Sequence, residues 1–264
     1  MGTPSFHNQV VWVIGASSGI GRATAKAFAE AGANVILSAR QVSELEALAQ
    51  EISAETLVLP LDLTDEEGRA SAVQTAEAWR GRVDILVNNA GISQRALALE
   101  TTEETLRQLM EVNFFGTVAL TKLIAPHMIA RKSGQIVVVT SVTGQVATPL
   151  RSGYAASKHA LHGYFDALRA ELHETGVDVT LIMPGFVRTN ISVSAVTADG
   201  SPLGKLEENT AGGISAEECA EGILQATAKR KREKLIGGKE ILSVYLKRFA
   251  PGLLARMVPK AIPK

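Results

Sequence analysis

The sequence predicts a single doubly wound α/β domain in which helices cover both faces of a parallel sheet. Short runs rich in β-branched residues recur along the chain, and each is apolar nearly throughout, as in strands buried on both faces. Amphipathic stretches with helical periodicity separate these runs, and this alternation is typical of parallel α/β sheets. The 264 residues are enough to bury a full core in one domain. In this fold class, ligands bind at the carboxyl ends of the strands.

Six strands are expected from the apolar runs, at residues 10–14, 35–38, 56–59, 85–87, 136–140 and 179–183. A helix is expected over residues 22–31. Four further helices are expected to start where Ser or Thr precedes Glu at the spacing of a capping box. These pairs are Ser43 with Glu46, Thr64 with Glu67, Thr101 with Glu104, and Ser215 with Glu218.

The longest stretch without clear periodicity covers about residues 189–213, after the sixth expected strand. It contains four glycines and Pro202. A loop of this length in a compact domain is usually a functional lid or a disordered segment. Because it leaves the carboxyl end of a strand, where ligands bind, we expect a substrate lid.

The charges are distributed unevenly although they sum to zero. Residues 229–264 hold 11 of the 27 basic and 2 of the 27 acidic residues, so this segment carries +9 and residues 1–228 carry −9. Residues 245–264 mix basic with large apolar side chains. We expect residues 1–244 to form the folded domain and residues 245–264 a basic amphipathic extension. Packing on the domain or on a neighbouring subunit is its favoured role, and weak peripheral contact with an anionic membrane is the alternative.

Several absences narrow the class of protein. No Lys or Arg precedes Arg22, no apolar run reaches the length of a membrane span, and Cys219 is the only cysteine, which predicts a cytoplasmic protein. The basic run 229–234 lacks interleaved aromatic residues, so nucleic-acid binding is not expected. The five histidines form no H-E-x-x-H or similar pattern, and His159 and His162 have no acid at ligand spacing, so no metal is expected.

A glycine-rich turn, GASSGIG over residues 15–21, follows the first expected strand. Glycines at a strand-to-helix turn let the backbone approach a pyrophosphate, which the helix N-terminus attracts. The turn therefore predicts a dinucleotide site. The same letters satisfy G-x-S-x-G, the nucleophile elbow of α/β-hydrolases, with Ser17 as the nucleophile. The elbow normally follows several earlier strands, whereas this turn follows the first, so the hydrolase is the weaker alternative.

Arg40, after the second expected strand, indicates which dinucleotide is bound. About twenty residues beyond the last glycine, this fold places an acid on a ribose 2′-hydroxyl or a basic group on a 2′-phosphate. Ala39 cannot accept the hydroxyl, whereas the Arg40 guanidinium suits a phosphate. We therefore expect NADP(H) to be preferred over NAD(H).

Polar residues on otherwise apolar faces are candidates for catalysis. Ser141 closes the fifth expected strand, Tyr154 lies thirteen residues further on, and Lys158 follows one helical turn later. An ammonium near a phenol lowers the pKa of the phenol toward working pH, so Tyr154 is a candidate general acid/base. Asn113 lies at position i+7 of an apolar helix face, and a buried amide needs hydrogen-bond partners. Each of these residues alone is common in proteins, and only the combination of the four indicates a catalytic site.

Together these motifs resemble the short-chain dehydrogenase/reductase family. In family order and spacing the chain shows GASSGIG at 15–21, NNAG at 88–91, Asn113, Ser141, YAASK at 154–158 and PGFVRT at 184–189. The resemblance covers about residues 8–240. It implies a Rossmann-type domain with seven parallel strands in order 3-2-1-4-5-6-7, the seventh at residues 234–237. It also implies a homodimer or homotetramer in which helices at residues 105–131 and 152–175 pack across a two-fold axis.

The resemblance further implies roles for single residues. Tyr154 would be the acid/base, Ser141 would hold the substrate oxygen, Lys158 would bind the nicotinamide ribose and lower the pKa of Tyr154, and Asn113 would hold a proton-relaying water. Family members that use NADP often carry another basic residue where Ser18 stands, so the preference for NADP(H) rests on Arg40 alone. The implied cofactor site consists of Gly15, Ser17, Ser18, Gly19, Ile20, Gly21, Arg40, Asp62, Leu63, Asn89, Ala90, Gly91, Tyr154, Lys158, Pro184, Gly185, Val187 and Thr189.

The sequence thus predicts an oxidoreductase that transfers a hydride between NADP(H) and a small-molecule carbonyl or alcohol substrate. The apolar lid residues Ile191, Val193, Val196 and Leu203 favour a hydrophobic, lipid-like or alicyclic substrate. A non-catalytic dinucleotide sensor or scaffold and a serine hydrolase using Ser17 are the alternatives.

Overall fold

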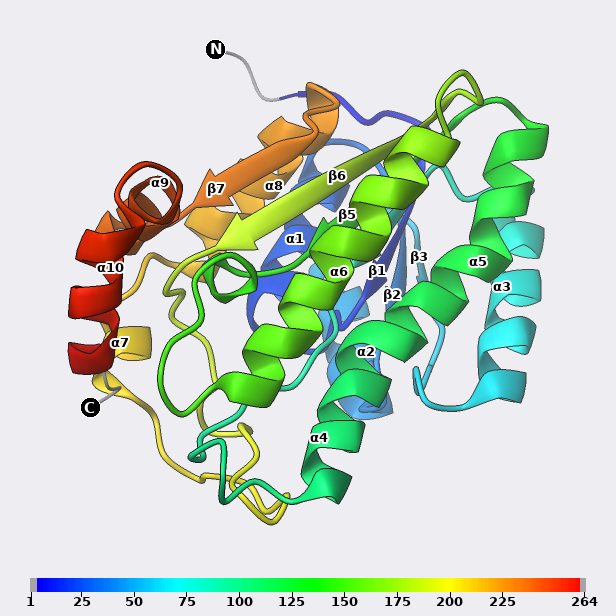
Figure 1. Ribbon diagram of the computed structural model, residues 1–264. Coiled ribbons are helices and arrows are strands. Elements are labelled where there is room, and N and C mark those ends of the chain that lie inside the picture. Colours follow the sequence, from blue (N-terminus) through cyan, green and yellow to red (C-terminus); the bar gives the residue numbers. More distant parts are fainter. Residues whose placement is uncertain (1–3, 262–264) are drawn as a thin grey trace.

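A seven-stranded sheet with helices on both faces forms the centre of the computed structural model, which describes residues 4–261 (Figure 1). Every strand pairing is parallel and the order is β3-β2-β1-β4-β5-β6-β7, so the predicted fold class and strand order are confirmed. The strands are β1 (Val10–Ile14), β2 (Asn34–Ser38), β3 (Thr56–Val58), β4 (Ile85–Asn88), β5 (Gly134–Val139), β6 (Val177–Pro184) and β7 (Glu233–Ile236).

Helices and short helical turns lie between the strands and after the last strand. The helices are α1 (Gly19–Glu30), α2 (Val42–Glu51), α3 (Glu66–Arg80), α4 (Glu103–Met110), α5 (Gly116–Ala130), α6 (Ser152–Glu171), α7 (Glu208–Ala211), α8 (Ala216–Ala228), α9 (Leu242–Phe249) and α10 (Pro251–Met257). The turns are a π-helical turn, η1 (Glu111–Phe115), and the 3-10 turns η2 (Val142–Gly144), η3 (Lys239–Ile241) and η4 (Val258–Lys260).

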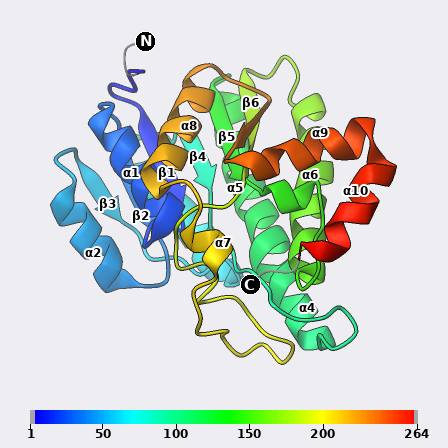
Figure 2. The ribbon, with the colours of Figure 1, turned by 90° about the vertical axis from the view of Figure 1, so that its left-hand side faces the viewer.

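Two apolar clusters, one on each face of the sheet, hold the layers together. Figure 2 shows the strands between α1 and α2 on one side and α5 and α6 on the other. Phe28 of α1 packs in the first cluster and Phe165 of α6 in the second, and both side chains are fully buried. In β1, Val13 points into the first cluster and Trp12 into the second. Burial on both faces is the reason why the strands are apolar nearly throughout.

Local boundaries differ from the expected ones by a few residues. The seventh strand is Glu233–Ile236 instead of 234–237, and the first helix begins at Gly19 instead of Arg22. Ser141 does not close β5, which ends at Val139, but caps η2 by accepting a 3.0 Å hydrogen bond from the Thr143 N–H.

One of the four expected helix starts is confirmed. Ser215 and Glu218 form a complete capping box, with hydrogen bonds of 3.0 and 2.8 Å between each side chain and the other's backbone N–H. The other three helices begin one or two residues away because neighbouring residues occupy the cap position. The caps are Gln41, Asp65 and Thr102 where Ser43, Thr64 and Thr101 were expected.

The helix Glu103–Ala130, which runs through α4, η1 and α5, is long and apolar enough to cross a membrane by length and composition. The count of uninterrupted apolar residues missed it, because its mean hydropathy of 1.2 is reached with polar residues interspersed. In the structure Leu120, Ile124 and Met128 are fully buried against the sheet. This face of the helix therefore packs in the core of the domain, and 44% of the most apolar 18-residue window is buried.

The C-terminal segment folds back onto the domain as α9 and α10, at the β7 edge of the sheet in Figure 1. Helix α9 begins at Leu242, so the expected boundary after residue 244 falls inside a helix. Lys247 donates a hydrogen bond to the Gln145 carbonyl, and Leu254 is buried. These contacts fit the favoured alternative for this segment, packing on the domain; residues 1–3 and 262–264 lie outside the described part of the chain.

The expected lid, about residues 189–213, is anchored at several points. It contains the short helix α7, and Val196 forms isolated bridges with Gln94 and Pro202. Ser192 and Glu207 are buried. These bridges and buried side chains hold the segment against the rest of the domain.

Candidate active site

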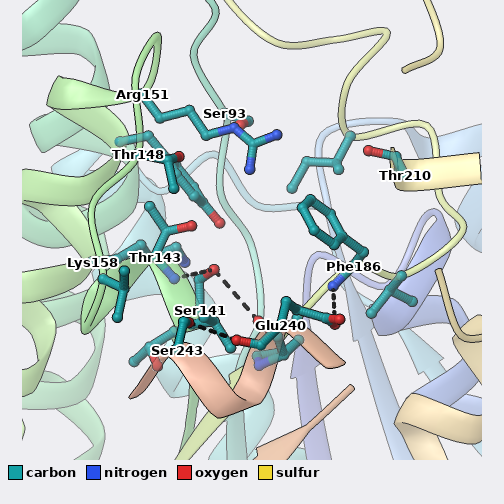
Figure 3. Close-up of a pocket in the computed structure, with 18 of the residues that line it drawn as sticks. Ser93, Ser141, Thr143, Thr148, Arg151, Lys158, Phe186, Thr210, Glu240 and Ser243 are labelled. Carbon is teal, nitrogen blue, oxygen red and sulfur yellow. Dashed lines mark hydrogen bonds between the residues drawn. The ribbon is translucent and has the colours of Figure 1, made fainter. Parts of the chain in front are cut away.

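Two adjoining cavities lie at the carboxyl ends of the strands. One, of about 320 Å³, is lined by the glycine loop, Arg40, Asp62 and Leu63. The other, of about 550 Å³, is lined by Ser141, Tyr154 and Lys158 among others (Figure 3). The two share Ile20, Asn89, Gly91, Thr189 and Ile191, so they form one continuous groove. Every residue of the expected cofactor set except Gly21 lines one of the two cavities.

The glycine loop has the geometry of a phosphate cradle. Gly15 adopts a left-handed backbone conformation with φ of 82°, which favours glycine. A Cβ atom on Gly21 would lie 2.0 Å from the Gly15 carbonyl oxygen, so Gly21 permits the tight turn without lining the groove. Ser18 precedes α1 without a side-chain capping bond, and the first turn of α1 holds no acid. The N–H groups of that turn are therefore available to a phosphate.

A carboxylate and a guanidinium, from Asp62 and Arg40, both line the smaller cavity. Asp62 Oδ1 accepts hydrogen bonds from the Thr64 N–H at 2.9 Å and the Thr64 hydroxyl at 2.8 Å. These bonds, with a smaller contribution from the Arg40 charge, hold the pKa of Asp62 below its ordinary value. Arg40 is exposed at the cavity wall, where its guanidinium can reach a bound anion.

Ser141, Tyr154 and Lys158 meet in the larger cavity. The Ser141 side chain lies close enough to the Tyr154 phenol to lower its pKa, and each of these residues is at most 9% exposed. Lys158 is also buried; its Nζ lies 5.8 Å from the centroid of the Tyr154 ring and donates a 3.0 Å hydrogen bond to the Val139 carbonyl. The first turns of α6 and the end of β5 thus place a hydroxyl, a phenol and an amine around one point.

The pKa of Tyr154 shifts in the direction opposite to the expected one. Burial raises the pKa of Tyr154 and outweighs the Ser141 hydroxyl and the charges of Arg151 and Arg95, which lower it. Burial also lowers the pKa of Lys158 to about 8. The expected lowering of the Tyr154 pKa by Lys158 is therefore not found in this structure, and Tyr154 is a protonated acid at neutral pH.

Asn113 lies in the π-helical turn η1, and its amide connects two segments of the site. Its Oδ1 accepts from the Ile92 N–H at 2.8 Å, while Nδ2 donates to the Ile92 carbonyl at 2.9 Å and to the Ser157 hydroxyl at 3.0 Å. A Cβ atom on Gly91 would lie 3.0 Å from Asn113 Oδ1 and 3.5 Å from Lys158 Nζ. Because both amide hydrogens are used inside the protein, Asn113 holds the 88–92 loop against α6.

Sequence reasoning missed a buried ionic cluster beside Tyr154. Arg95 donates through two nitrogens to the Glu207 carboxylate, and Arg151 Nη2 donates to the same carboxylate at 3.3 Å. Arg151 lies three residues before Tyr154, at the same end of α6, which is a signal that sequence could have given. Arg95 and Glu207 are 112 residues apart, and no local pattern connects them.

The apolar wall of the larger cavity also differs from the expected one. Of the four lid residues expected to meet the substrate, Ile191 lines the cavity and Val193, Val196 and Leu203 do not. Val196 is buried in its bridges to Gln94 and Pro202 instead. The apolar lining comes from Val139, Val142, Val146, Phe186, Val187, Ile191, Leu254, Met257 and Val258.

The histidines of α6 lie closer to acids than the sequence indicated. His162 has acids nearby after all: Asp166 follows one turn later on α6, and ligand atoms of His162, Asp166 and Glu233 lie within 4.8 Å of one another. The prediction that no acid lies at ligand spacing from these histidines was therefore wrong.

In the described part of the chain, the hydrolase alternative lacks a base beside its nucleophile. Ser17 donates a 3.2 Å hydrogen bond to Gln41 and, among residues 4–261, to no histidine.

Comparisons with known proteins agree on one family. The short chain dehydrogenase family model matches residues 9–199. The Mus musculus protein "Dehydrogenase/reductase SDR family member 7B" is 44% identical over 259 residues, covering 95% of this chain and 80% of its own. An Anopheles gambiae "Dehydrogenase/reductase SDR family protein 7-like" is 40% identical, covering 98% of this chain and 84% of its own.

Solved structures show the same fold. A short-chain dehydrogenase from Streptomyces avermitilis matches with a TM-score of 0.81 at 31% identity, over 95% of both chains. A short chain dehydrogenase/reductase from Burkholderia phymatum, solved in complex with NAD, matches with a TM-score of 0.84 at 24% identity, over 96% of both chains.

Proposed function

The chain belongs to the short-chain dehydrogenase/reductase family, and from that premise we propose that it transfers a hydride between NADP(H) and a carbonyl or alcohol substrate, with Tyr154 as general acid/base. One observation carries the proposal: Ser141, Tyr154 and Lys158 meet where the glycine-loop cavity opens into a second cavity with a mostly apolar wall. A dinucleotide sensor would need no such group of residues beside its cofactor.

The residues present fit a nicotinamide dinucleotide. The α1 N-terminus and the glycine loop would hold its pyrophosphate, Asp62 its adenine, and Lys158 its nicotinamide ribose. Pro184, Gly185, Val187 and Thr189 would line its nicotinamide. When bound in reduced form, the cofactor supplies the hydride for the carbonyl carbon.

The protein residues then handle the substrate oxygen. The Ser141 hydroxyl donates a hydrogen bond to the carbonyl oxygen and fixes its position. As the hydride adds to carbon, the Tyr154 hydroxyl donates its proton to that oxygen, so the carbonyl becomes an alcohol with one hydride and one proton added. Burial, which raises the pKa of Tyr154, keeps this proton in place at neutral pH. The Lys158 ammonium stabilises the phenolate that results.

A reductase screen tests this function. We expect the purified protein to consume NADPH in the presence of at least one ketone or aldehyde from a panel of lipid-like and alicyclic compounds. The Tyr154→Phe variant is the control for contaminating reductases. No turnover with any carbonyl, together with none for the matching alcohols and NADP, would argue against the oxidoreductase and for a binding protein.

Replacement of Arg40 by Asp is expected to reverse the cofactor preference. The Arg40 guanidinium would pair with the 2′-phosphate, and a charge-assisted bond of this kind makes NADPH bind roughly tenfold or more tighter than NADH. In a fluorescence titration, Arg40→Asp should weaken NADPH and leave NADH as tight or tighter. Arg248→Asp, the same charge reversal on the exposed face of α9, should change neither affinity. Equal affinities of the parent protein for the two cofactors would contradict the preference.

Two exposed apolar surfaces are proposed to bind different partners. On the α5–α6 side, Phe115 and Leu123 are exposed and Gly163 has open space above it, which favours close approach of a second copy. On α9 and α10, exposed apolar side chains alternate with basic ones, and Phe249 is 81% exposed, which favours an anionic membrane surface.

One variant separates the two surfaces. We expect Phe249→Asp to abolish liposome binding at low salt without changing the dimer or tetramer mass in sedimentation. Leu99→Asp, at a fully exposed leucine outside both surfaces, should change neither. If the intact protein does not bind anionic liposomes at low salt, the membrane contact is wrong, and a monomer in sedimentation would refute the oligomer.

A further inference from the structure

An arginine with unused hydrogen-bond donors faces the proposed substrate cavity. The Arg151 side chain is only 10% exposed, yet within residues 4–261 its guanidinium makes a single hydrogen bond, from Nη2 to Glu207. Its Nε is buried and has no partner in the described part of the chain. Buried guanidinium donors are normally satisfied, so such a group points to a ligand.

Glu207 does not neutralise both arginines. Its carboxylate receives Arg95 bidentately and Arg151 through one 3.3 Å bond. Burial would raise the pKa of Glu207, but the Arg95 hydrogen bond and the charges of both arginines outweigh it and hold the pKa below the ordinary value. The cluster therefore contains two cations and one anion, all at most 10% exposed, and retains one uncompensated positive charge.

The other charged groups of the cavity do not supply the missing anion. Glu240 also lines it, but its Oε1 accepts from the Phe186 N–H at 2.8 Å and the Gly238 N–H at 3.0 Å. Figure 3 shows Glu240 well apart from Arg151, whose guanidinium extends into the cavity toward the Phe186 ring, 5.7 Å away. Lys158 and Lys260, which also line the cavity, add positive charge.

We propose that the substrate carries an oxyanionic group, a carboxylate or a phosphate, that the Arg151 guanidinium binds next to the reacting carbonyl. Arg151 lies close enough to Tyr154 for its charge to act on the phenol, so the anion and the carbonyl belong to one end of the substrate. A guanidinium donates two parallel hydrogen bonds to either kind of oxyanion. The rest of the substrate lies against the apolar wall that reaches Leu254 and Met257 of α10. This inference rests on the proposed oxidoreductase function and specifies its substrate.

Matched pairs of carbonyl compounds test the proposal. One pair is a medium-chain 3-oxoalkanoate and its methyl ester, and the other is a 2-oxoalkyl phosphate and the corresponding hydroxyketone. We expect kcat/KM with NADPH to be about 10- to 100-fold higher for the anionic member of a pair, since a hydrogen bond to a charged group has about that effect. The pair with the larger ratio identifies carboxylate or phosphate as the bound group.

Variants of Arg151 assign this ratio to one side chain. Arg151→Met should reduce the anionic-to-neutral ratio to near one, mainly through KM, while Glu207 keeps its bidentate partner Arg95 and the fold is preserved. Arg151→Lys should restore part of the ratio. The control Arg107→Met removes an exposed arginine of α4 and should leave the ratio unchanged.

The outcomes separate this proposal from the function on which it rests. Reduction of the neutral members as efficiently as the anionic ones would overturn the anion site and leave the oxidoreductase intact. If no compound is reduced, thermal shifts of the protein with each probe decide. A shift with the anionic probes alone that Arg151→Met removes supports the site without the oxidoreductase, and equal shifts within each pair refute it.

Discussion

Replacement of Tyr154 by Phe is expected to lower kcat by about 10²- to 10⁴-fold, the range that a positioned general acid/base contributes. The hydroxyl of Tyr154 lies beside Ser141 in the larger cavity, and burial keeps its proton in place at neutral pH. The variant loses this proton donor and little else, because Phe fills the same buried space. We therefore expect an unchanged circular dichroism spectrum and an unchanged affinity for NADPH, measured beside the loss of turnover.

A second tyrosine of the same helix provides the control for this result. Tyr164 packs against Phe114 and Phe165 away from the larger cavity, so Tyr164→Phe deletes a hydroxyl from α6 without touching the site. Its kcat should stay within about twofold of the parent value. Full activity in Tyr154→Phe, or an equal loss in both variants, would contradict the assignment of Tyr154 as the acid.

Replacement of Lys158 by Met is expected to abolish turnover and at the same time to stabilise the protein below pH 8. Burial lowers the pKa of Lys158 from 10.5 to about 8, so the folded state at neutral pH holds a cation that its surroundings disfavour. This shift corresponds to about 3 kcal/mol, from which the lost hydrogen bond to the Val139 carbonyl subtracts about 1 kcal/mol. In denaturant unfolding, the free energy of unfolding of Lys158→Met should therefore exceed that of the parent by about 2 kcal/mol.

The gain depends on pH in a defined direction. Below pH 8, Lys158 is charged in both the folded and the unfolded state, so the folded protein bears the full free-energy cost of the buried ammonium. From about pH 8 to 10.5 the folded state gives up this proton while the unfolded state keeps it, so the parent protein becomes more stable with rising pH. The difference between the variant and the parent should thus shrink over this window. Lys122→Met, at an exposed position of α5, should show no such trend, and equal stabilities of Lys158→Met and the parent at pH 7 would contradict the account.

Strands and turns were predictable because their signals are local. The apolar run at residues 10–14 is β1 without change, since a strand buried on both faces needs apolar residues at every position. The glycine loop was equally clear, because a Cβ on Gly21 would collide with the Gly15 carbonyl and only glycine fits there. The spacing of Tyr154 and Lys158 also follows directly from the helical period.

The substrate side of the site could not be predicted in this way. Arg95 and Glu207 form their ion pair across 112 residues of sequence, and the partner of Arg151 is the same distant carboxylate. The pKa of Tyr154 depends on burial by several elements at once, so a single neighbouring ammonium gave the wrong direction. Leu254 of α10 reaches the cavity because the segment folds back along the β7 edge, which no periodicity indicates.

The central claim, that Tyr154 donates the proton while a hydride from the cofactor reaches the same carbonyl, is tested most directly by isotope transfer. NADPH deuterated at the transferred position of C4 is incubated with a reducible carbonyl compound, and the alcohol is analysed by mass spectrometry. The account predicts one deuterium on the carbinol carbon with the parent protein and almost no product with Tyr154→Phe. An alcohol formed without deuterium at that carbon, or formed equally well by Tyr154→Phe, would contradict it.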